Sequence, residues 1–170
     1  MRLLLVRHAT AVPRGTPGIA DDERPLTPQG TAEFRVVAKG LARIADRPEV
    51  LLTSPLPRAR VTAEILAKAF TRIDPRIEPA VAHDSVDDIV VALKRQPPRG
   101  TIALVGHEPT LSALIARLLG AAVQDALAFE KGGAALVDLP EGPSVTGRLI
   151  WFLEPRILRM LASEVAGEGD

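Results

Sequence analysis

Two histidines in this chain each follow a short run of apolar residues. His8 comes two positions after the end of the run 3–6, and His107 comes two positions after the end of the run 102–105. Continuous apolar runs of this length are typical of strands that are buried on both faces in a parallel sheet. In such sheets, ligands bind just beyond the carboxyl ends of the strands. The pattern predicts an α/β fold with both imidazoles in one pocket; the alternative is that each histidine only satisfies local hydrogen bonds.

Arginines accompany these predicted strand ends. Arg7 directly precedes His8, Arg24 lies in the loop segment 21–27, and Arg58 follows a third apolar run at 50–53. A guanidinium stays charged at any working pH, and its planar fork of N–H donors fits a phosphate bidentately. Three arginines around two histidines therefore predict a pocket for a phosphate dianion.

Ion pairing offers a second explanation for some of the arginines. Arg24 is close in sequence to the two aspartates at 21–22, and Arg60 precedes Glu64 by one helical turn. Arg58 has no carboxylate three or four residues away in either direction, so pairing along its own helix does not explain it. The sequence leaves open whether Arg60 reaches the pocket.

The bulk composition is that of a globular protein. The chain has 170 residues, of which 46% are hydrophobic and 25% charged, so we expect a single domain over 1–170. Its 21 basic and 21 acidic residues leave no net field, and we therefore expect neither nucleic acid nor a membrane as a partner. Cysteine is absent, which excludes disulfides, cysteine-ligated zinc and phosphatases that use a cysteine nucleophile.

The N-terminus predicts a first strand instead of a secretory signal. Its apolar run is only a few residues long, and it lacks a cleavage site of small residues. No apolar stretch approaches the roughly 20 residues that a membrane-spanning helix needs. We therefore expect a cytoplasmic protein, and we expect it to be a monomer.

Apolar spacing and capping residues divide the chain into alternating strands and helices, with a hairpin near the end. Strands are predicted at 3–6, 50–53, 101–105, 134–139 and 148–153, and helices at 28–45, 57–69, 85–94, 109–118 and 155–165. This order predicts a single three-layer α/β domain, in which helices flank both faces of a mostly parallel sheet.

Absent motifs narrow the chemistry further. The chain has no Gly-x-Gly-x-x-Gly after a strand, no Gly-x4-Gly-Lys-Ser/Thr and no Gly-x-Ser-x-Gly. These absences disfavour a dinucleotide-binding protein, a nucleoside-triphosphatase and a serine hydrolase. Arginines at the strand ends would repel a cation, so we expect no metal ion.

Four ordered motifs together resemble a known family. They are LVRHA at 5–9, RPLTPQG at 24–30, SPLPRA at 54–59 and VGHEP at 105–109. In this order they are similar to the histidine phosphatase superfamily, which has the phosphoglycerate mutase-like fold, and within it to the small phosphohistidine phosphatases of the SixA type. The resemblance covers most of the chain.

The resemblance implies a role for each matching residue. His8 would be the nucleophile that becomes phosphorylated, and His107 would complete the pocket. Arg7, Arg24 and Arg58 would bind the phosphoryl oxygens, with Arg7 and Arg58 also counted among the catalytic residues. The family needs neither a metal nor an organic cofactor.

One position departs from the family pattern. Many members have an acidic residue after a mid-chain strand, in the region that matches 81–84, where Asp84 is a loose match. Glu108, Asp84 and Asp21 could each supply a proton, and the general acid stays open between these residues and no acid at all. A weak or missing acid favours a phosphohistidine substrate, because an imidazole leaves a phosphoramidate as a neutral ring with little help.

The residues also support this chemistry without the resemblance. A neutral imidazole can attack phosphorus in line and form a phosphohistidine that water then hydrolyses. Nearby arginines disfavour the protonated imidazole, so His8 would stay available near neutral pH. The leading function is dephosphorylation of phosphohistidine on a protein of a phosphorelay or phosphotransfer system. The alternatives are a phosphatase of small phosphate esters, nucleotides or polyphosphate, and a phosphate-binding module without turnover.

Overall fold

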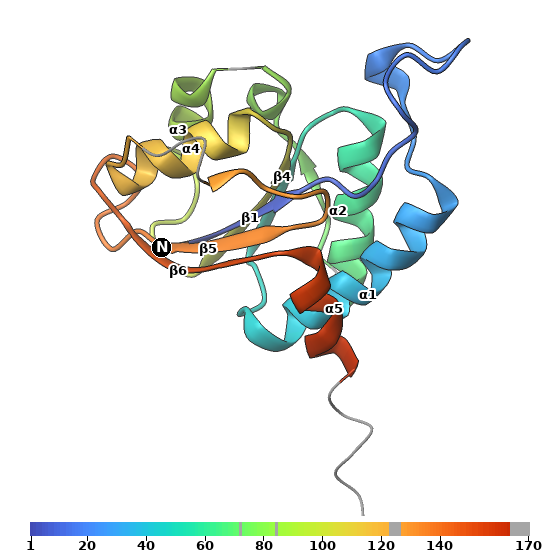
Figure 1. Cartoon of the computed structure of the whole chain (residues 1–170). Helices are drawn as coiled ribbons and strands as arrows, with labels where there is room; N and C mark the ends of the chain where they lie inside the picture. The colour runs from blue at the N-terminus through green and yellow to red at the C-terminus, as the bar shows by residue number, and fades with distance from the viewer. Residues whose placement is uncertain (72, 84, 123–126, 164–170) are drawn as a thin grey trace, which may run out of the picture.

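The computed structural model describes residues 1–71, 73–83, 85–122 and 127–163. These residues form a six-stranded sheet with helices on both faces (Figure 1). The strands are β1 (Arg2–Arg7), β2 (Val50–Thr53), β3 (Arg76–Ile77), β4 (Thr101–Gly106), β5 (Ala134–Asp138) and β6 (Arg148–Leu153). The helices are α1 (Pro28–Ile44), α2 (Pro57–Ala69), α3 (Val86–Lys94), α4 (Thr110–Leu119) and α5 (Pro155–Ser163).

The strand order across the sheet is β3-β2-β4-β1-β5-β6. β1, β2, β3 and β4 run parallel to one another, whereas β5 runs antiparallel to both β1 and β6. β5 and β6 are therefore a hairpin at one edge of a mostly parallel sheet. The predicted α/β class, the flanking helices and the closing hairpin are confirmed.

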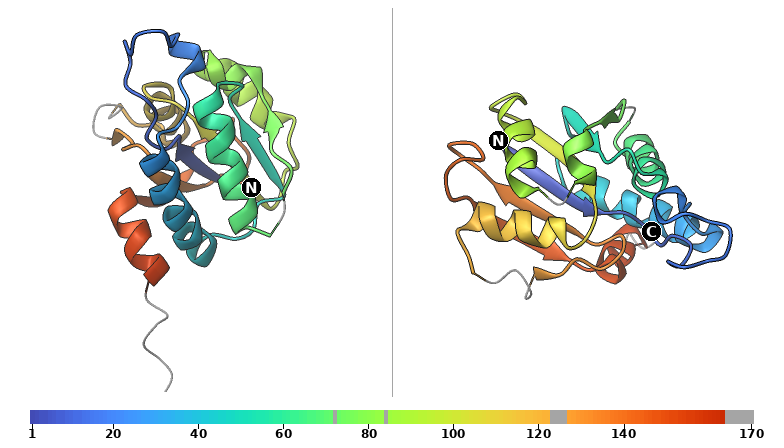
Figure 2. Two further views of the ribbon diagram at one scale, coloured as in Figure 1. Left: turned by 90° about the vertical axis from the view of Figure 1, so that its right-hand side faces the viewer. Right: turned by 90° about the horizontal axis from the view of Figure 1, so that it is seen from above.

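Alternating residues of β1 divide the core into two layers. Leu4 and Val6 pack with α1, α2 and α5, and Leu3 and Leu5 pack with α3 and α4 on the other face. The views in Figure 2 show these two helical layers on either side of the sheet. All four side chains are fully buried, and each such burial is worth about 1.5–3 kcal/mol. This two-sided burial explains why the strand is a continuous apolar run.

Local sequence signals set most of the helix boundaries. Thr27 caps α1, its side chain accepting a hydrogen bond from the Gly30 amide at 2.9 Å, and Ser85 caps α3 in the same way. Helix α4 begins at Thr110, one residue later than predicted, and ends before Gly120, whose φ of 62° is left-handed. The last part of the predicted C-terminal helix, 164–165, lies outside the described residues.

Strand β3 is an element that the sequence did not predict. It has only two residues, both exposed, and it pairs with Leu52 and Thr53 at the edge of the sheet. A segment this short shows no hydrophobic alternation, so no periodicity marks it.

Two glycines of α1 allow close approach of neighbouring backbone. A Cβ atom on Gly30 would lie 2.2 Å from the carbonyl oxygen of Thr10, and one on Gly40 would lie 1.9 Å from that of Leu158 in α5. The first contact brings α1 against the segment that follows β1, and the second lets α5 cross α1. Within the described ranges, no helix has the length and apolar character needed to cross a membrane.

Candidate active site

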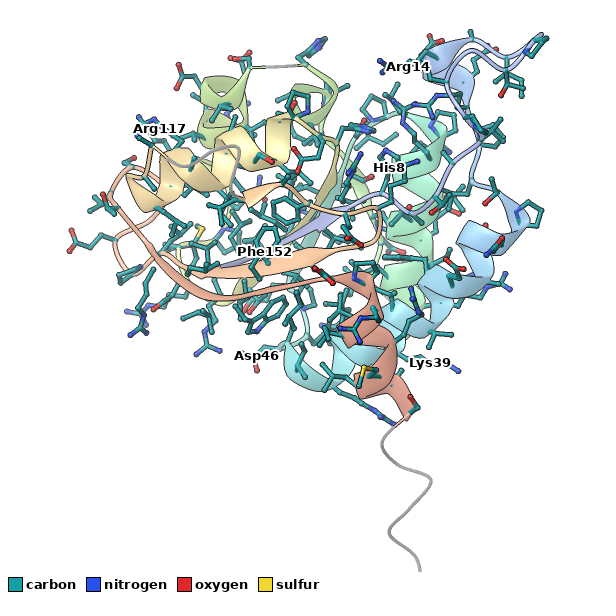
Figure 3. The ribbon with its side chains drawn as sticks, in the orientation of Figure 1. His8, Arg14, Lys39, Asp46, Arg117 and Phe152 are labelled. Atoms are coloured by element: carbon teal, nitrogen blue, oxygen red, sulfur yellow. The ribbon has the colours of Figure 1, made fainter. Side chains whose placement is uncertain are left out.

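The register of the central strands brings the two predicted histidines together. Arg7 is paired with Gly106 where β1 and β4 end, and the His8 amide donates a hydrogen bond to the Gly106 carbonyl at 3.0 Å. The rings of His8 and His107 follow directly, with centroids 5.1 Å apart and planes inclined by 55°. Figure 3 shows His8 just past the end of β1. The two imidazoles therefore share one site, as the strand-end pattern predicts.

The hydrogen bond of His8 fixes which ring nitrogen is free. Its Nδ1 lies 2.7 Å from the carbonyl oxygen of Ala9, and a carbonyl can only accept, so Nδ1 carries the proton. Nε2 of the neutral ring is then unprotonated and keeps its lone pair. Thr62 holds this segment in place, because its hydroxyl accepts from the Ala9 amide at 3.0 Å and donates to the Arg58 carbonyl at 2.6 Å. The site thus presents one nucleophilic nitrogen.

Both imidazoles are neutral at pH 7. Burial lowers the pKa of His8 to about 3; the hydrogen bond to Ala9 opposes this shift, and the positive charges of Arg58 and Arg7 add to it. Burial also lowers the pKa of His107 to about 4, assisted by the charges of Arg58, Arg24 and Arg7. The arginines act in the predicted direction, but loss of hydration on burial is the larger cause.

The same site holds buried polar atoms that lack a protein partner. Among the described residues these are Nε of Arg7, Nε of Arg58 and both ring nitrogens of His107. An unsatisfied buried polar group costs about 1–3 kcal/mol, so such groups rarely gather in one place without a ligand-binding role. A tetrahedral oxyanion could accept hydrogen bonds from several of these donors at once.

Asp21 organises two of the predicted phosphate ligands. Its carboxylate lies 2.9 Å from Nε of Arg24 and 3.9 Å from Nη2 of Arg58, and its backbone carbonyl accepts from Nη1 of Arg58 at 2.8 Å. Arg14, on the projecting loop labelled in Figure 3, also reaches this carboxylate at 2.8 Å. The Arg14 hydrogen bond is the largest cause of the lowered pKa of Asp21, and Arg24 adds to it.

The predicted pairing of Arg24 with Asp21 is therefore present, and it does not remove Arg24 from the site. Arg24 and Arg58 are both buried, with 8% and 5% of their surface exposed, and both their charges act on His107. The carboxylate that Arg58 lacks on its own helix comes from the loop after β1. Asp21 is thus a counter-ion at the site, a role that the local sequence did not reveal.

A second set of contacts, absent from the sequence prediction, fixes Arg7. Its Nη1 donates to the carbonyl of Phe129, and the Phe129 amide donates to Glu108 Oε1 at 2.9 Å. The hydroxyl of Ser112 donates to the other oxygen of Glu108. Glu108 therefore joins the start of α4 to the segment that holds Arg7.

These contacts bear on the general acid. Both oxygens of Glu108 already accept hydrogen bonds within the protein, so this carboxylate fits a positioning role better than proton donation. Asp84, the other candidate, lies outside the described residues. Asp21 pairs with Arg14 and Arg24, which lower its pKa and disfavour it as a proton donor. The general acid stays unassigned between Asp84 and no acid.

Arg60 lines a hollow that contains none of the histidines or the other arginines of the site. It is exposed on α2 and lines this hollow with Thr53, Glu64, Pro75 and Ile77. In the part of the chain that the structure describes, it makes no ion pair with Glu64. The described residues also contain no group of three or more His, Asp or Glu that could hold a metal ion.

Known proteins resemble this chain in sequence and in fold. The family model of the histidine phosphatase superfamily (branch 1) matches residues 3–82. A solved structure of a candidate phosphohistidine phosphatase SixA from Agrobacterium tumefaciens is 30% identical, with a TM-score of 0.77, and the match covers 91% of this chain and 97% of that one.

Two more distant structures share the fold. The protein histidine phosphatase SixA in complex with tungstate is 22% identical, with a TM-score of 0.77 and coverage of 93% of this chain and 99% of that one. A candidate α-ribazole-5′-P phosphatase from Escherichia coli is 19% identical, with a TM-score of 0.76 and coverage of 91% and 98%.

Proposed function

Because this chain belongs to the histidine phosphatase superfamily, we propose that it removes the phosphoryl group from phosphohistidine on a protein substrate. His8 is the nucleophile in this proposal, and a phosphohistidine on His8 is the intermediate. The observation that carries it is the unprotonated Nε2 of a neutral His8, held beside buried donors that lack a protein partner.

In the first step Nε2 of His8 attacks phosphorus, and the bond from phosphorus to the substrate nitrogen breaks. The bonding electron pair returns to the substrate imidazole, which leaves as a neutral ring because its other nitrogen carries a proton. In the second step water attacks the phosphorus of phospho-His8. The electron pair then returns to Nε2, inorganic phosphate leaves, and the proton lost by water passes to the phosphate product.

The cationic groups stabilise the transferring phosphoryl group. Arg7, Arg24 and Arg58 bind its oxygens, and His107 donates a hydrogen bond to an equatorial oxygen, where charge accumulates in the transition state. Tungstate is a tetrahedral oxyanion like phosphate, and its complex with a protein of the same fold supports the binding of such an oxyanion by this fold. The positive charge comes from the protein, so the proposal requires no metal.

A phosphatase of small phosphate esters is the second candidate. The structural similarity to the Escherichia coli protein, whose name gives a small phosphate ester as substrate, favours it. An alkoxide leaving group needs a proton donor, and neither Glu108 nor Asp21 is free for this task, because both oxygens of Glu108 accept hydrogen bonds and Asp21 pairs with Arg24. The site therefore favours the better leaving group, imidazole. A module without turnover would not need the free Nε2 of His8.

A substrate panel tests the proposal. Initial rates are measured on a phosphohistidine peptide, an aryl phosphate, a sugar phosphate and polyphosphate, with His8→Ala as the background control. We expect the highest kcat/KM on the phosphohistidine peptide. A higher value on the sugar phosphate or polyphosphate would select the second candidate, and no hydrolysis of any substrate would select the binding module.

A further inference from the structure

A cationic hollow borders the phosphate site on one side. It has a volume of about 460 Å³, and its charged lining consists of Arg7, Lys131, Arg156 and Arg159 together with Glu33 and Glu130. Arg7 belongs to both places, because its charge also acts on the two histidines. The hollow therefore lies beside a phosphoryl group that is held by Arg7.

The topology explains why the hollow lies at the catalytic edge. β5 runs antiparallel to β1, so Lys131, which precedes β5, lies where β1 ends. The Gly132 amide confirms this placement, since it lies 3.2 Å from the carbonyl oxygens of both Arg7 and His8. β6 ends at the same edge and leads into α5, which carries Arg156 and Arg159 (Figure 1).

The carboxylates of the hollow balance only part of its positive charge. In the described part of the chain, the side chains of Lys131 and Arg159 make no ion pair or hydrogen bond, and Arg156 contacts only the Met160 sulfur, at 3.9 Å. Four cations face two carboxylates, so the lining carries a net positive charge of two. Unpaired cations around a concave surface attract anions.

We propose that this hollow is a subsite for a second anionic group of the substrate, an acidic side chain that flanks the phosphohistidine of a protein. The inference rests on the proposed function and adds a rule of substrate selection to it. A carboxylate in the hollow meets Lys131 and Arg159 while the phosphoryl group is held by Arg7. The phosphate chain of a small molecule has the same charge and is the other source of such a group.

The test compares two phosphohistidine peptides that differ only in the flanking residues, which are glutamate in one and glutamine in the other. For the unmodified protein at low ionic strength, we expect kcat/KM to be about tenfold higher for the glutamate peptide, because each exposed ion pair contributes a few-fold. Salt should shrink this ratio, since the Debye length falls from about 30 Å at 0.01 M to about 8 Å at 0.15 M.

The variant is the double substitution Lys131→Ala with Arg159→Ala, which should reduce the ratio to about one. A matched control removes two cations elsewhere. Arg35 and Lys39 line a separate groove between α1 and α2, and Arg35→Ala with Lys39→Ala should leave the ratio unchanged. An unchanged ratio in the Lys131 and Arg159 variant would overturn the subsite. An equal loss in both double variants would overturn it too, because the effect would then be one of overall charge.

A third measurement distinguishes the two sources of the anion. Inhibition of aryl phosphate hydrolysis is measured with tripolyphosphate and with orthophosphate. The double variant could lose the tighter inhibition by tripolyphosphate relative to orthophosphate while its preference for the glutamate peptide stays unchanged. In that case the hollow takes a phosphate chain, and the acidic side chain is the wrong occupant. If the protein hydrolyses aryl phosphate but no phosphohistidine peptide, the proposed function fails; the inhibition constants still report whether the hollow binds an anion.

Discussion

Acid should destabilise this protein through its two active-site histidines. Folding buries both rings in their neutral form, with a pKa of about 3 for His8 and about 4 for His107. In the unfolded chain each imidazole has a pKa of about 6.5. Between these values the unfolded state binds protons that the folded state does not, so stability is present above about pH 6.5 and is lost as the pH falls.

The magnitude follows from the width of that interval. Each pH unit below the unfolded pKa costs about 1.4 kcal/mol per histidine, so a fall from pH 7 to pH 5 costs about 2 kcal/mol for each ring and about 4 kcal/mol for both. The result does not depend on how far the folded pKa lies below 5. It is a large part of the 5–15 kcal/mol that is typical of the total stability of a domain.

Urea unfolding at pH 7 and pH 5, in buffers without phosphate or sulfate, measures this loss. His8→Asn and His107→Asn should each reduce it by about 2 kcal/mol, because the titrating ring is gone. His83, the remaining histidine, is exposed, and His83→Asn supplies the matched control. The reasoning is refuted if the variant that lacks both His8 and His107 loses as much stability between pH 7 and pH 5 as the unmodified protein.

Three further predictions address single residues of the site. His8→Ala should abolish turnover and also the acid-labile phosphoenzyme that rapid quench traps. His107→Ala should slow turnover by about 10²–10³-fold and still leave a phosphoryl group on His8. Peptide mapping of the trapped enzyme locates the phosphoryl group, and its presence on another residue would contradict the assigned roles. Asp21→Ala should raise KM about fivefold with a smaller change in kcat, because Arg24 and Arg58 lose the counter-ion that orients them. The effect is modest because this carboxylate is 45% exposed. Asp22→Ala is the control, and a lowered KM would mean that Asp21 competes with the substrate. Gly30→Ala should destabilise the fold by at least about 2 kcal/mol in urea unfolding, since the new Cβ would lie 2.2 Å from a carbonyl oxygen; unchanged stability would show that α1 moves away freely.

The sequence alone determined the architecture and the central members of the site. Apolar runs, caps and turn residues act over a few positions, so they are visible without a structure, and they located every strand and helix described above except β3. The proximity of His8 to His107 followed from the same signals. Each histidine comes just after a predicted parallel strand, and the carboxyl ends of parallel strands lie at one edge of the sheet. Strand β3 was not predicted, because a segment of two residues is too short to show hydrophobic periodicity.

Tertiary structure alone decided how the site is held and charged. Arg7 is fixed by Phe129, 122 residues away in sequence, and Arg58 contacts the backbone carbonyl and the carboxylate of Asp21, 37 residues upstream in a loop. Burial, and not only the predicted arginine charges, lowers the pKa of His8. The cationic hollow likewise brings Lys131 next to α5, although the whole β5–β6 hairpin separates them in sequence. Contacts of this kind depend on where the folded backbone places distant segments, and no local pattern of residue types records that distance.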